Sequence, residues 1–246
     1  LLGKQVLNRP AIVIVIDALE QALQLARVLH QSSRWHHANL EAALNPIPTP
    51  LIARHVGQLT GNLAICHVPA QADVNHLREI AASRGAFQVI FAGKAHPHDL
   101  EGKALIRKIF ETKKTLGSSI RIAYLQNYDM TLGRLMTSGV DLWLNTPRPP
   151  LEASGTSGMK AALNGVPSLS ILDGWWIEGH VEGITGWAIG ESAEGKPQKA
   201  DSDRDVESLY GKLEKKILPL FYERLGRYQQ VMRNSIALNG AFVENL

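Results

Sequence analysis

The sequence predicts an α/β protein built on a doubly wound parallel sheet, because strand-like and helix-like segments alternate along the chain. Runs rich in β-branched and aromatic residues recur at residues 11–16, 87–93, 120–125, 140–144 and 168–172. Segments with apolar residues at helical spacing separate several of these runs, and such alternation favours a parallel sheet with helices on its faces. Polar loops follow the predicted strands, and in such sheets ligands bind at the carboxyl ends of the strands.

The first third of the chain contains one strand–helix unit. The β-branched run at residues 11–16 is followed by an apolar helical pattern at residues 18–31. Prolines at positions 46, 48 and 50 then predict an irregular connection. We expect a further strand at residues 63–68 and a helix at residues 73–82.

The remaining elements follow from the same patterns. Residues 102–114 and 132–137 are predicted helices between the strands, whereas residues 182–204 are polar and glycine-rich and predict a loop. An amphipathic helix begins near Val206 and is expected to end at Pro219, because proline interrupts a helix. A final helix is expected at about residues 227–238.

Composition limits the classes of partner. The 246 residues are enough for one large domain or two small ones, and the net charge of +3 without a dense Lys/Arg block argues against nucleic acid. No apolar run approaches a membrane span, which argues against a membrane partner. The single cysteine, Cys66, excludes an internal disulfide framework and indicates a cytoplasmic protein. His36 and His37 are adjacent, but no third ligand stands at metal-binding spacing, so we expect no metal site.

The stretch from Pro150 to Gly165 carries the most information about function. Its first half is small and hydroxylated, and apolar residues at helical spacing then predict a loop that turns into a buried helix, ended by the Asn-Gly pair at positions 164 and 165. The first N–H groups of a helix have no internal partner and attract an anion. Gly155 and Gly158 would let an anion approach closely, because glycine has no Cβ. The pattern therefore predicts a phosphate site.

Lys160 is expected in the first turn of this helix. The positive end of the helix dipole disfavours an ammonium there and favours a neutral amine, which can bond covalently to an aldehyde. A phosphate site beside such a lysine is what pyridoxal 5′-phosphate requires. The alternative from pattern alone is a simple helix cap beside a solvated lysine.

A family resemblance favours the cofactor site. The segment EASGTSGMK at residues 152–160 closely resembles the pyridoxal-phosphate segment of the α-glucan (glycogen, starch and maltodextrin) phosphorylases. Other stretches resemble the shorter, bacterial and archaeal branch in order and spacing: FAGKAHP at 91–97, NYDM at 127–130, GVDLWLNTP at 139–147, LDGWW at 172–176 and GWAIG at 186–190. The resemblance runs from about Phe87 to near the C-terminus.

The resemblance implies the Rossmann-like C-terminal lobe of a two-lobe glycosyltransferase, with helices at its C-terminal end and the active site between the lobes. We expect residues 1–62, which match the family poorly, to form a strand–helix segment and linker, and residues 63–246 to form this lobe. The N-terminal lobe would then be a missing partner. Because the first residue is leucine and no signal peptide is visible, we expect the chain to begin partway through a longer product.

The resemblance also implies residue roles in cofactor binding. Lys160 would carry pyridoxal phosphate covalently, and the N–H groups of Thr156 and Ser157 would hold its phosphate. The Tyr128 hydroxyl would be a further contact, although the pattern alone favours a core tyrosine bonded to backbone. In this family the cofactor phosphate exchanges a proton with the substrate phosphate.

The implied substrates are an α-1,4-glucan and inorganic phosphate, with glucose 1-phosphate as product. Glu152 and the amides of Ser154 and Gly155 would meet hydroxyls of the glucosyl unit. Trp175 and Trp176 could stack on sugar faces, but we expect at least one of them to cover the core.

One departure from the family leaves enzymatic activity open. The family binds substrate phosphate with an Arg/Lys cluster after the first strand of this lobe, whereas residues 63–76 here contain no Lys or Arg. Phosphate transfer needs fixed cations, so we expect the isolated chain to be a poor catalyst. Two alternatives remain: a nucleotide-sugar glycosyltransferase of the same architecture, against which Lys160 argues, and a non-catalytic lobe that binds glucan or a partner chain.

Overall fold

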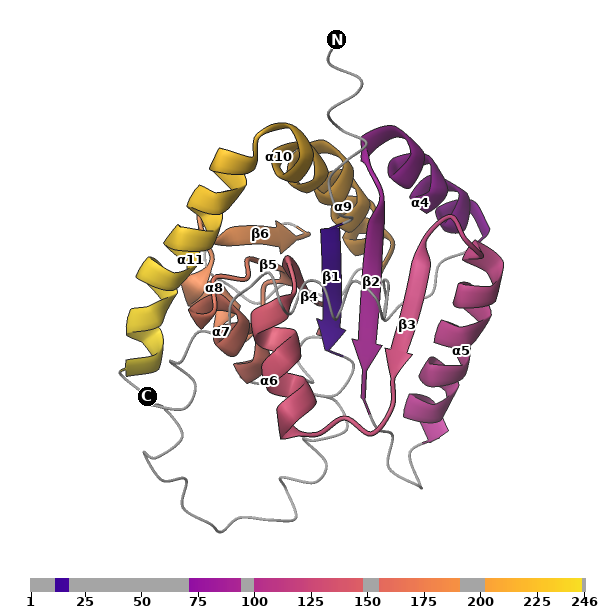
Figure 1. The fold of residues 1–246 in the computed structure, drawn as a ribbon, viewed down its shortest axis with the longest axis horizontal. Coiled ribbons are helices and arrows are strands. Elements are labelled where there is room, and N and C mark those ends of the chain that lie inside the picture. Colours follow the sequence, from indigo (N-terminus) through magenta and orange to yellow (C-terminus); the bar gives the residue numbers. More distant parts are fainter. Residues whose placement is uncertain (1–11, 18–70, 94–99, 148–154, 191–201, 245–246) are drawn as a thin grey trace.

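The computed structural model describes residues 12–17, 71–93, 100–147, 155–190 and 202–244. Within these residues six parallel strands form one sheet in the order β3-β2-β1-β4-β5-β6 (Figure 1). The strands are β1 (Ile12–Asp17), β2 (Phe87–Ala92), β3 (Arg121–Leu125), β4 (Leu142–Asn145), β5 (Ser168–Ile171) and β6 (Gly186–Ile189). The predicted α/β class with a parallel sheet is confirmed.

The strand order reverses direction at β1. The chain adds β2 and β3 on one side of β1 and then β4 to β6 on the other, so that Ile14 pairs with both Val89 and Leu142. Such a reversal leaves a crevice beyond the carboxyl ends of the two central strands, here β1 and β4, and ligands bind there in open α/β sheets. The helix that follows β4, residues 156–163, therefore begins next to this crevice.

The position of β1 bears on the expected division of the chain at residue 63. That division leaves β1 outside the lobe, whereas the structure places β1 between β2 and β4. The run at residues 12–17 completes the sheet because its two neighbours pair with it along their length. Three other expectations lie outside the described residues: the division point itself, the helix at residues 18–31 and the strand at residues 63–68.

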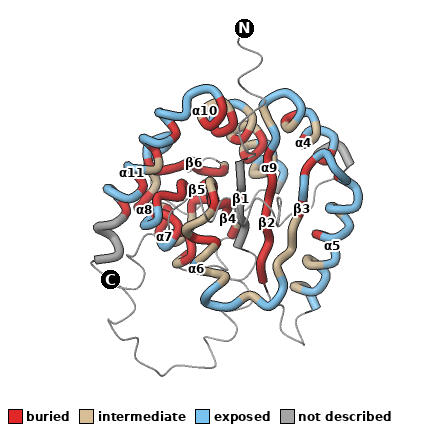
Figure 2. The backbone as a smooth tube through the Cα atoms, in the orientation of Figure 1, coloured by how far each residue is buried: buried red, intermediate tan, exposed pale blue. Residues whose placement is uncertain are grey.

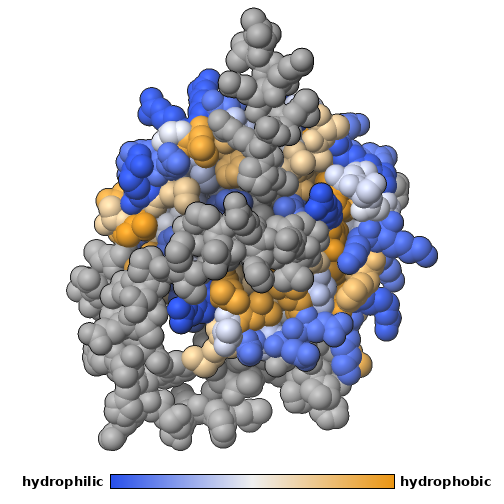
Figure 3. Space-filling model, in the orientation of Figure 1, coloured by the Kyte–Doolittle hydropathy of each residue, from blue (hydrophilic) through white to orange (hydrophobic). Residues whose placement is uncertain are grey.

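One face of the sheet packs against α4 (Gln71–Arg84), α5 (Leu100–Leu116), α9 (Ser202–Lys212) and α10 (Leu218–Glu223). Phe87, Val89 and Phe91 of β2 point to this face and share a core with Leu77 of α4 and Ile109 of α5. Figure 2 shows β2, β4, β5 and β6 buried, and much of the outer surface of α5 exposed. Hydrophilic residues dominate the surface on the side where α5 lies (Figure 3).

The opposite face packs against α6 (Met130–Gly139) and α7 (Thr156–Leu163). Ile90 of β2 and Trp143 of β4 are buried there together with Ala161 of α7. A third cluster joins α7 to α8 (Trp176–Gly179) and β6. The two faces are covered separately, as a doubly wound sheet requires.

The expected end of a helix at Pro219 is wrong. A five-residue π-helical turn, η3 (Leu213–Ile217), follows α9, and Pro219 lies in the first turn of α10. Proline is tolerated at that position, because a helix start needs no intrahelical donor. The last helix, α11 (Leu225–Glu244), confirms the one expected at residues 227–238 and extends beyond it at both ends.

The loop expected at residues 182–204 is also partly wrong, since Gly186–Ile189 forms the fully buried strand β6. This strand was hidden in the sequence because it is only four residues long and a glycine stands at each side of its apolar core. A Cβ at Gly186 would lie 2.3 Å from the Ser168 carbonyl oxygen, so glycine is needed for β6 to pair with β5. None of the described helices has the length and apolar content needed to cross a membrane.

Candidate functional site

The loop-to-helix transition is confirmed, with Gly155 at the helix start. Gly155 has φ 67° and ψ 41°, a left-handed conformation that glycine adopts without strain, and it supplies no side-chain cap. Its carbonyl accepts a hydrogen bond from the Gly158 N–H at 3.1 Å. Asn164 caps the other end and Gly165 has φ 75°, so the predicted Asn-Gly stop is confirmed. The first N–H groups of α7 thus begin beyond the carboxyl end of β4 without a side-chain cap.

The sequence predicts Lys160 in the first turn of α7, and this prediction is wrong. The helix begins at Thr156, which makes Lys160 its fifth residue and places it in the last turn. The helix-dipole argument for a neutral amine therefore does not apply at this position. Lys160 is exposed and stands four residues after Thr156, so the two side chains share one face of the helix.

The buried face of α7 contains an unsatisfied hydroxyl. Ser157 is 8% exposed, and its Oγ finds no hydrogen-bond partner in the described part of the chain. Ala161, one turn further along, belongs to the apolar cluster that contains Trp143 and Val166. Because a buried polar group without a partner costs free energy, Ser157 marks a place where a further polar group is expected to bind.

Two more unsatisfied polar atoms lie at the same edge of the sheet. Thr146 Oγ1 follows β4 and Asp173 Oδ2 follows β5, and both are buried without a hydrogen-bond partner among residues that the structure describes. Burial raises the pKa of Asp173, and the hydrogen bond from the Gly174 N–H offsets part of this rise. Sequence analysis included both residues in segments that resemble the family but gave neither of them a role.

The two glycines of the segment also accommodate a tryptophan. A Cβ at Gly155 would lie 2.9 Å from Cδ1 of Trp175, and a Cβ at Gly158 would lie 3.0 Å from its Nε1. Trp175 and Trp176 are both buried, at 7% and 1% exposure, which confirms that at least one of them covers the core. The indole of Trp175 therefore forms one wall of the turn that begins α7.

Tyr128 lies on the same face of the sheet as α7. Its ring packs partly buried against the cluster that contains Trp143 and Ala161. A Cβ at Gly133 would lie 2.6 Å from the Tyr128 hydroxyl oxygen, so the tyrosine tip sits over the first turn of α6. This placement agrees with a core tyrosine and brings it near the helix that carries Lys160.

The other predicted site residues fall outside the described residues. Glu152 and Ser154 belong to residues 148–154, which lie outside the described ranges. Of residues 63–76, in which the family's cation cluster was expected, only 71–76 are described, and they lie in α4.

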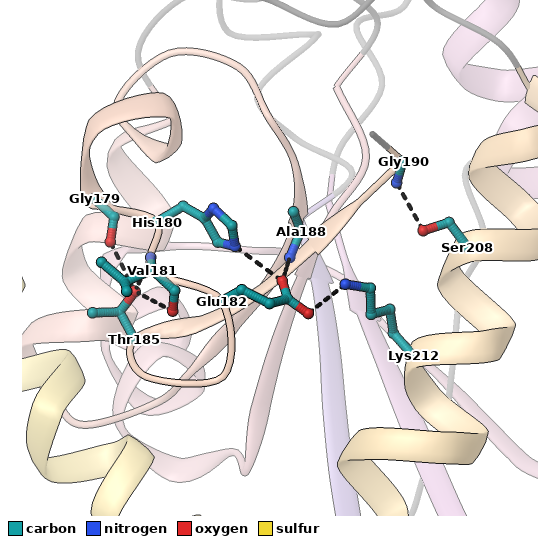
Figure 4. Close-up of polar contacts among 9 residues, drawn as sticks. All are labelled: Gly179, His180, Val181, Glu182, Thr185, Ala188, Gly190, Ser208 and Lys212. Atoms are coloured by element: carbon teal, nitrogen blue, oxygen red, sulfur yellow. Dashed lines mark hydrogen bonds and ion pairs between the residues drawn. The ribbon is translucent and has the colours of Figure 1, made fainter. Parts of the chain in front are cut away.

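A second polar cluster joins β6 to α9 and has no counterpart in the sequence analysis (Figure 4). The Glu182 carboxylate accepts hydrogen bonds from the Ala188 N–H at 3.0 Å and from Lys212 Nζ, and it contacts His180 Nε2 at 3.0 Å. Burial alone would raise the pKa of Glu182, but the bonds from His180, Lys212 and Ala188 together lower it to about 2. These contacts satisfy the edge of β6 and indicate a structural role.

Comparison with known proteins identifies the family. Residues 65–186 match the model of the carbohydrate phosphorylases. Over this segment the chain is a member of the carbohydrate phosphorylase family. The phosphorylase segment spans β2 to β5 together with α7. It therefore includes Lys160 and the three residues with unsatisfied polar atoms, Thr146, Ser157 and Asp173.

Two relatives show how the phosphorylase segment compares with whole proteins. The chain is 49% identical over 148 residues to a maltodextrin phosphorylase of Thermococcus litoralis. The matched region covers 60% of this chain and 18% of the relative. It is 52% identical over 154 residues to a glycogen phosphorylase of Aquifex aeolicus. The matched region covers 62% of this chain and 22% of the relative. The chain thus spans about a fifth of the length of these phosphorylases.

A solved structure supports the fold. The Anabaena protein HepE in complex with UDP superposes with a TM-score of 0.52 at 15% identity, over 79% of this chain and 49% of that chain. At this identity the likeness concerns the α/β Rossmann-like fold alone.

Proposed function

We propose that this chain supplies the cofactor-holding lobe of an α-glucan phosphorylase-type glycosyltransferase. The reaction is the reversible transfer of a glucosyl unit between the end of an α-1,4-glucan and inorganic phosphate, with glucose 1-phosphate as product. The family match and the relatives named maltodextrin and glycogen phosphorylase support this proposal. A second lobe is the partner that completes the active site.

The observation that carries the proposal is the buried Ser157 hydroxyl without a partner at the start of α7. A phosphate group bound at this turn would meet the uncapped N-terminal end of the helix and an unsatisfied hydroxyl together. Lys160 stands one turn further along, on the exposed face that it shares with Thr156. The residues present therefore fit pyridoxal 5′-phosphate.

In this arrangement each residue has a defined task. Lys160 holds the cofactor covalently, the N–H groups of Thr156 and Ser157 hold its phosphate, and Tyr128 lies on the same face of the sheet. When bound, pyridoxal phosphate supplies a phosphate group that donates a proton to the substrate phosphate and accepts one from it. The buried wall formed by Trp175 keeps water from the inner side of the turn.

The substrate side of the site is less complete. Glu152, with the amides of Ser154 and Gly155, would bind hydroxyls of the glucosyl unit. Residues 63–76 contain no Lys or Arg to stabilise the substrate phosphate. We therefore propose that the isolated chain binds the cofactor but lacks part of the machinery for turnover.

Reductive labelling tests the cofactor site. The purified chain is incubated with pyridoxal 5′-phosphate and reduced with borohydride, and the modified peptide is identified by mass spectrometry. We expect one adduct per chain on the peptide that contains Lys160, and loss of this adduct in Lys160→Arg. The exposed lysines of α5, such as Lys113 and Lys114, serve as internal controls for non-specific modification.

The outcome separates the candidate functions. Equal labelling of the α5 lysines, or no labelling together with tight binding of a nucleotide sugar, would contradict the proposal and favour a nucleotide-sugar glycosyltransferase. If Lys160 is labelled, formation of glucose 1-phosphate from maltodextrin is then measured. We expect a rate at least about 100-fold below that of a full-length relative, the scale of losing one group that stabilises transition-state charge. A rate equal to that of the relative would show that the lobe needs no further cations.

A further inference from the structure

The indole of Trp175 occupies a slot lined by glycines from two helices. Besides the contacts with Gly155 and Gly158 at the start of α7, a Cβ at Gly179 of α8 would lie 2.6 Å from Cζ3 and 2.8 Å from Cε3 of the same ring. The pyrrole edge of the indole thus faces α7, and its benzene edge faces α8. One buried ring connects the two helices across positions that carry no side chain.

Backbone conformation does not explain the glycines at 158 and 179. Neither has a positive φ, whereas Gly155 does. Alanine is the better helix former, so glycine within a helix indicates a packing constraint. The atoms nearest to an added Cβ at Gly158 belong to the Trp175 indole, and at Gly179 they belong to the same indole and to Asn239, whose Oδ1 would lie 3.2 Å away.

We propose that Trp175 is the positioning residue of the anion-binding turn, and that Gly179 determines from the far side where its indole lies. The Gly155 turn that orients the first N–H groups of α7 rests on the Cδ1 edge of the ring. A ring pushed from α8 has little free space on the α7 side, because it already lies within about 3.0 Å of where a Cβ at Gly155 or Gly158 would stand. Close-packed interiors transmit such a displacement, so the N–H groups would turn away from the anion. The identity of that anion, the phosphate of pyridoxal phosphate, rests on the proposed function.

The test is Gly179→Ala, which adds one methyl group outside the anion site. Gly211→Ala is the matched control, because Gly211 is also helical, has no positive φ and has no atom within 4 Å of an added Cβ. Two quantities are measured. The first is ligand affinity, determined for pyridoxal 5′-phosphate and for pyridoxal, and the second is the hydrogen exchange of the backbone amides of α7. We expect Gly179→Ala to weaken pyridoxal phosphate binding about tenfold, the scale of a favourable charge at a helix N-terminus, and to leave pyridoxal binding unchanged. Exchange in α7 should rise, and Gly211→Ala should change neither quantity.

A second substitution separates positioning from general loss of packing. Trp175→Phe removes part of the ring that meets position 179, so Gly179→Ala/Trp175→Phe should show slower exchange in α7 and tighter pyridoxal phosphate binding than Gly179→Ala alone. A variant that is merely less stable would not be rescued by a second loss of core volume. Unchanged exchange in α7 of Gly179→Ala, or no rescue by Trp175→Phe, would overturn the proposal. If the wild type does not bind pyridoxal phosphate, the proposed function fails, and the exchange data alone decide whether Trp175 positions the turn.

Discussion

At the scale of single residues, three buried polar atoms without a hydrogen bond lie near the carboxyl edge of the sheet, whereas others, such as Ser168 Oγ, lie elsewhere in the core. Ser157, Thr146 and Asp173 each bury a polar atom that finds no hydrogen bond among the described residues, and all three follow or begin an element at this edge. A protein retains such groups at a cost in stability, which is expected where a ligand later satisfies them.

Ser157→Ala is predicted to have opposite effects on stability and on binding. Removing a buried hydroxyl without a partner should raise the free energy of unfolding of the free chain by about 1 kcal/mol. Loss of a donor to a phosphate should weaken pyridoxal phosphate binding by about tenfold. Denaturant unfolding and an equilibrium titration measure the two effects.

Ser168→Ala is the matched control, because Ser168 Oγ is also buried without a partner in the described structure but lies at the amino end of β5. It should gain similar stability and leave the affinity for pyridoxal phosphate unchanged. Equal loss of affinity in both variants would remove the special role of Ser157.

At the scale of elements, the edge strand β6 is closed by side chains. The N–H groups of Ala188 and Gly190 donate to Glu182 and to Ser208 Oγ, the latter at 2.8 Å. An open strand edge with free N–H groups invites pairing with another chain, and these bonds occupy two of the N–H groups of β6. Thr185 holds the preceding turn, since its hydroxyl donates to the Gly179 carbonyl at 2.8 Å.

The Glu182 cluster predicts how stability depends on pH. Its pKa is lowered to about 2, so the stability that it contributes is present above its ordinary pKa and is lost as the pH falls from about 4.5 toward 2. Glu182→Gln should lower the free energy of unfolding at pH 7 by about 1 kcal/mol, the upper range for a partly exposed ion pair, and by much less near pH 2. Denaturant unfolding over this pH range measures the difference, with the exposed Glu178→Gln on α8 as control. A loss independent of pH would contradict the ionic role.

At the scale of the whole molecule, buried tyrosines fix the C-terminal helices to the sheet. The Tyr222 hydroxyl donates to the Ala86 carbonyl before β2, and the Tyr228 hydroxyl donates to the Asp141 carbonyl before β4 at 2.5 Å. Gly85 is required here, since it has φ 121° and a Cβ would lie 2.4 Å from the Tyr222 ring. The C-terminal helices therefore stabilise the amino edge of the sheet.

Local patterns predicted the alternation of strands and helices and the helix stop at Asn164-Gly165, because both depend on neighbours in sequence. They did not predict that the strand beginning at Ile12 lies at the centre of the sheet, since its partners stand about 75 and 130 positions later. Nor did they predict β6, which is too short to show a period, or the helix start at Thr156, which moved Lys160 to the last turn. The contact of Trp175 with three glycines joins segments that share no repeat, so only the folded chain shows it.

The most direct measurement of the central claim is an equilibrium titration of the intact chain with pyridoxal 5′-phosphate and, in parallel, with pyridoxal. Both ligands carry the aldehyde carbon that Lys160 would bind, and pyridoxal has a hydroxyl in place of the phosphate, so its affinity is calculated for the fraction present as free aldehyde rather than as the internal hemiacetal. If the start of α7 holds that phosphate, the chain binds pyridoxal phosphate at least about tenfold more tightly, the scale of a charge-assisted contact at a helix N-terminus. Equal affinities for the two ligands would contradict the account.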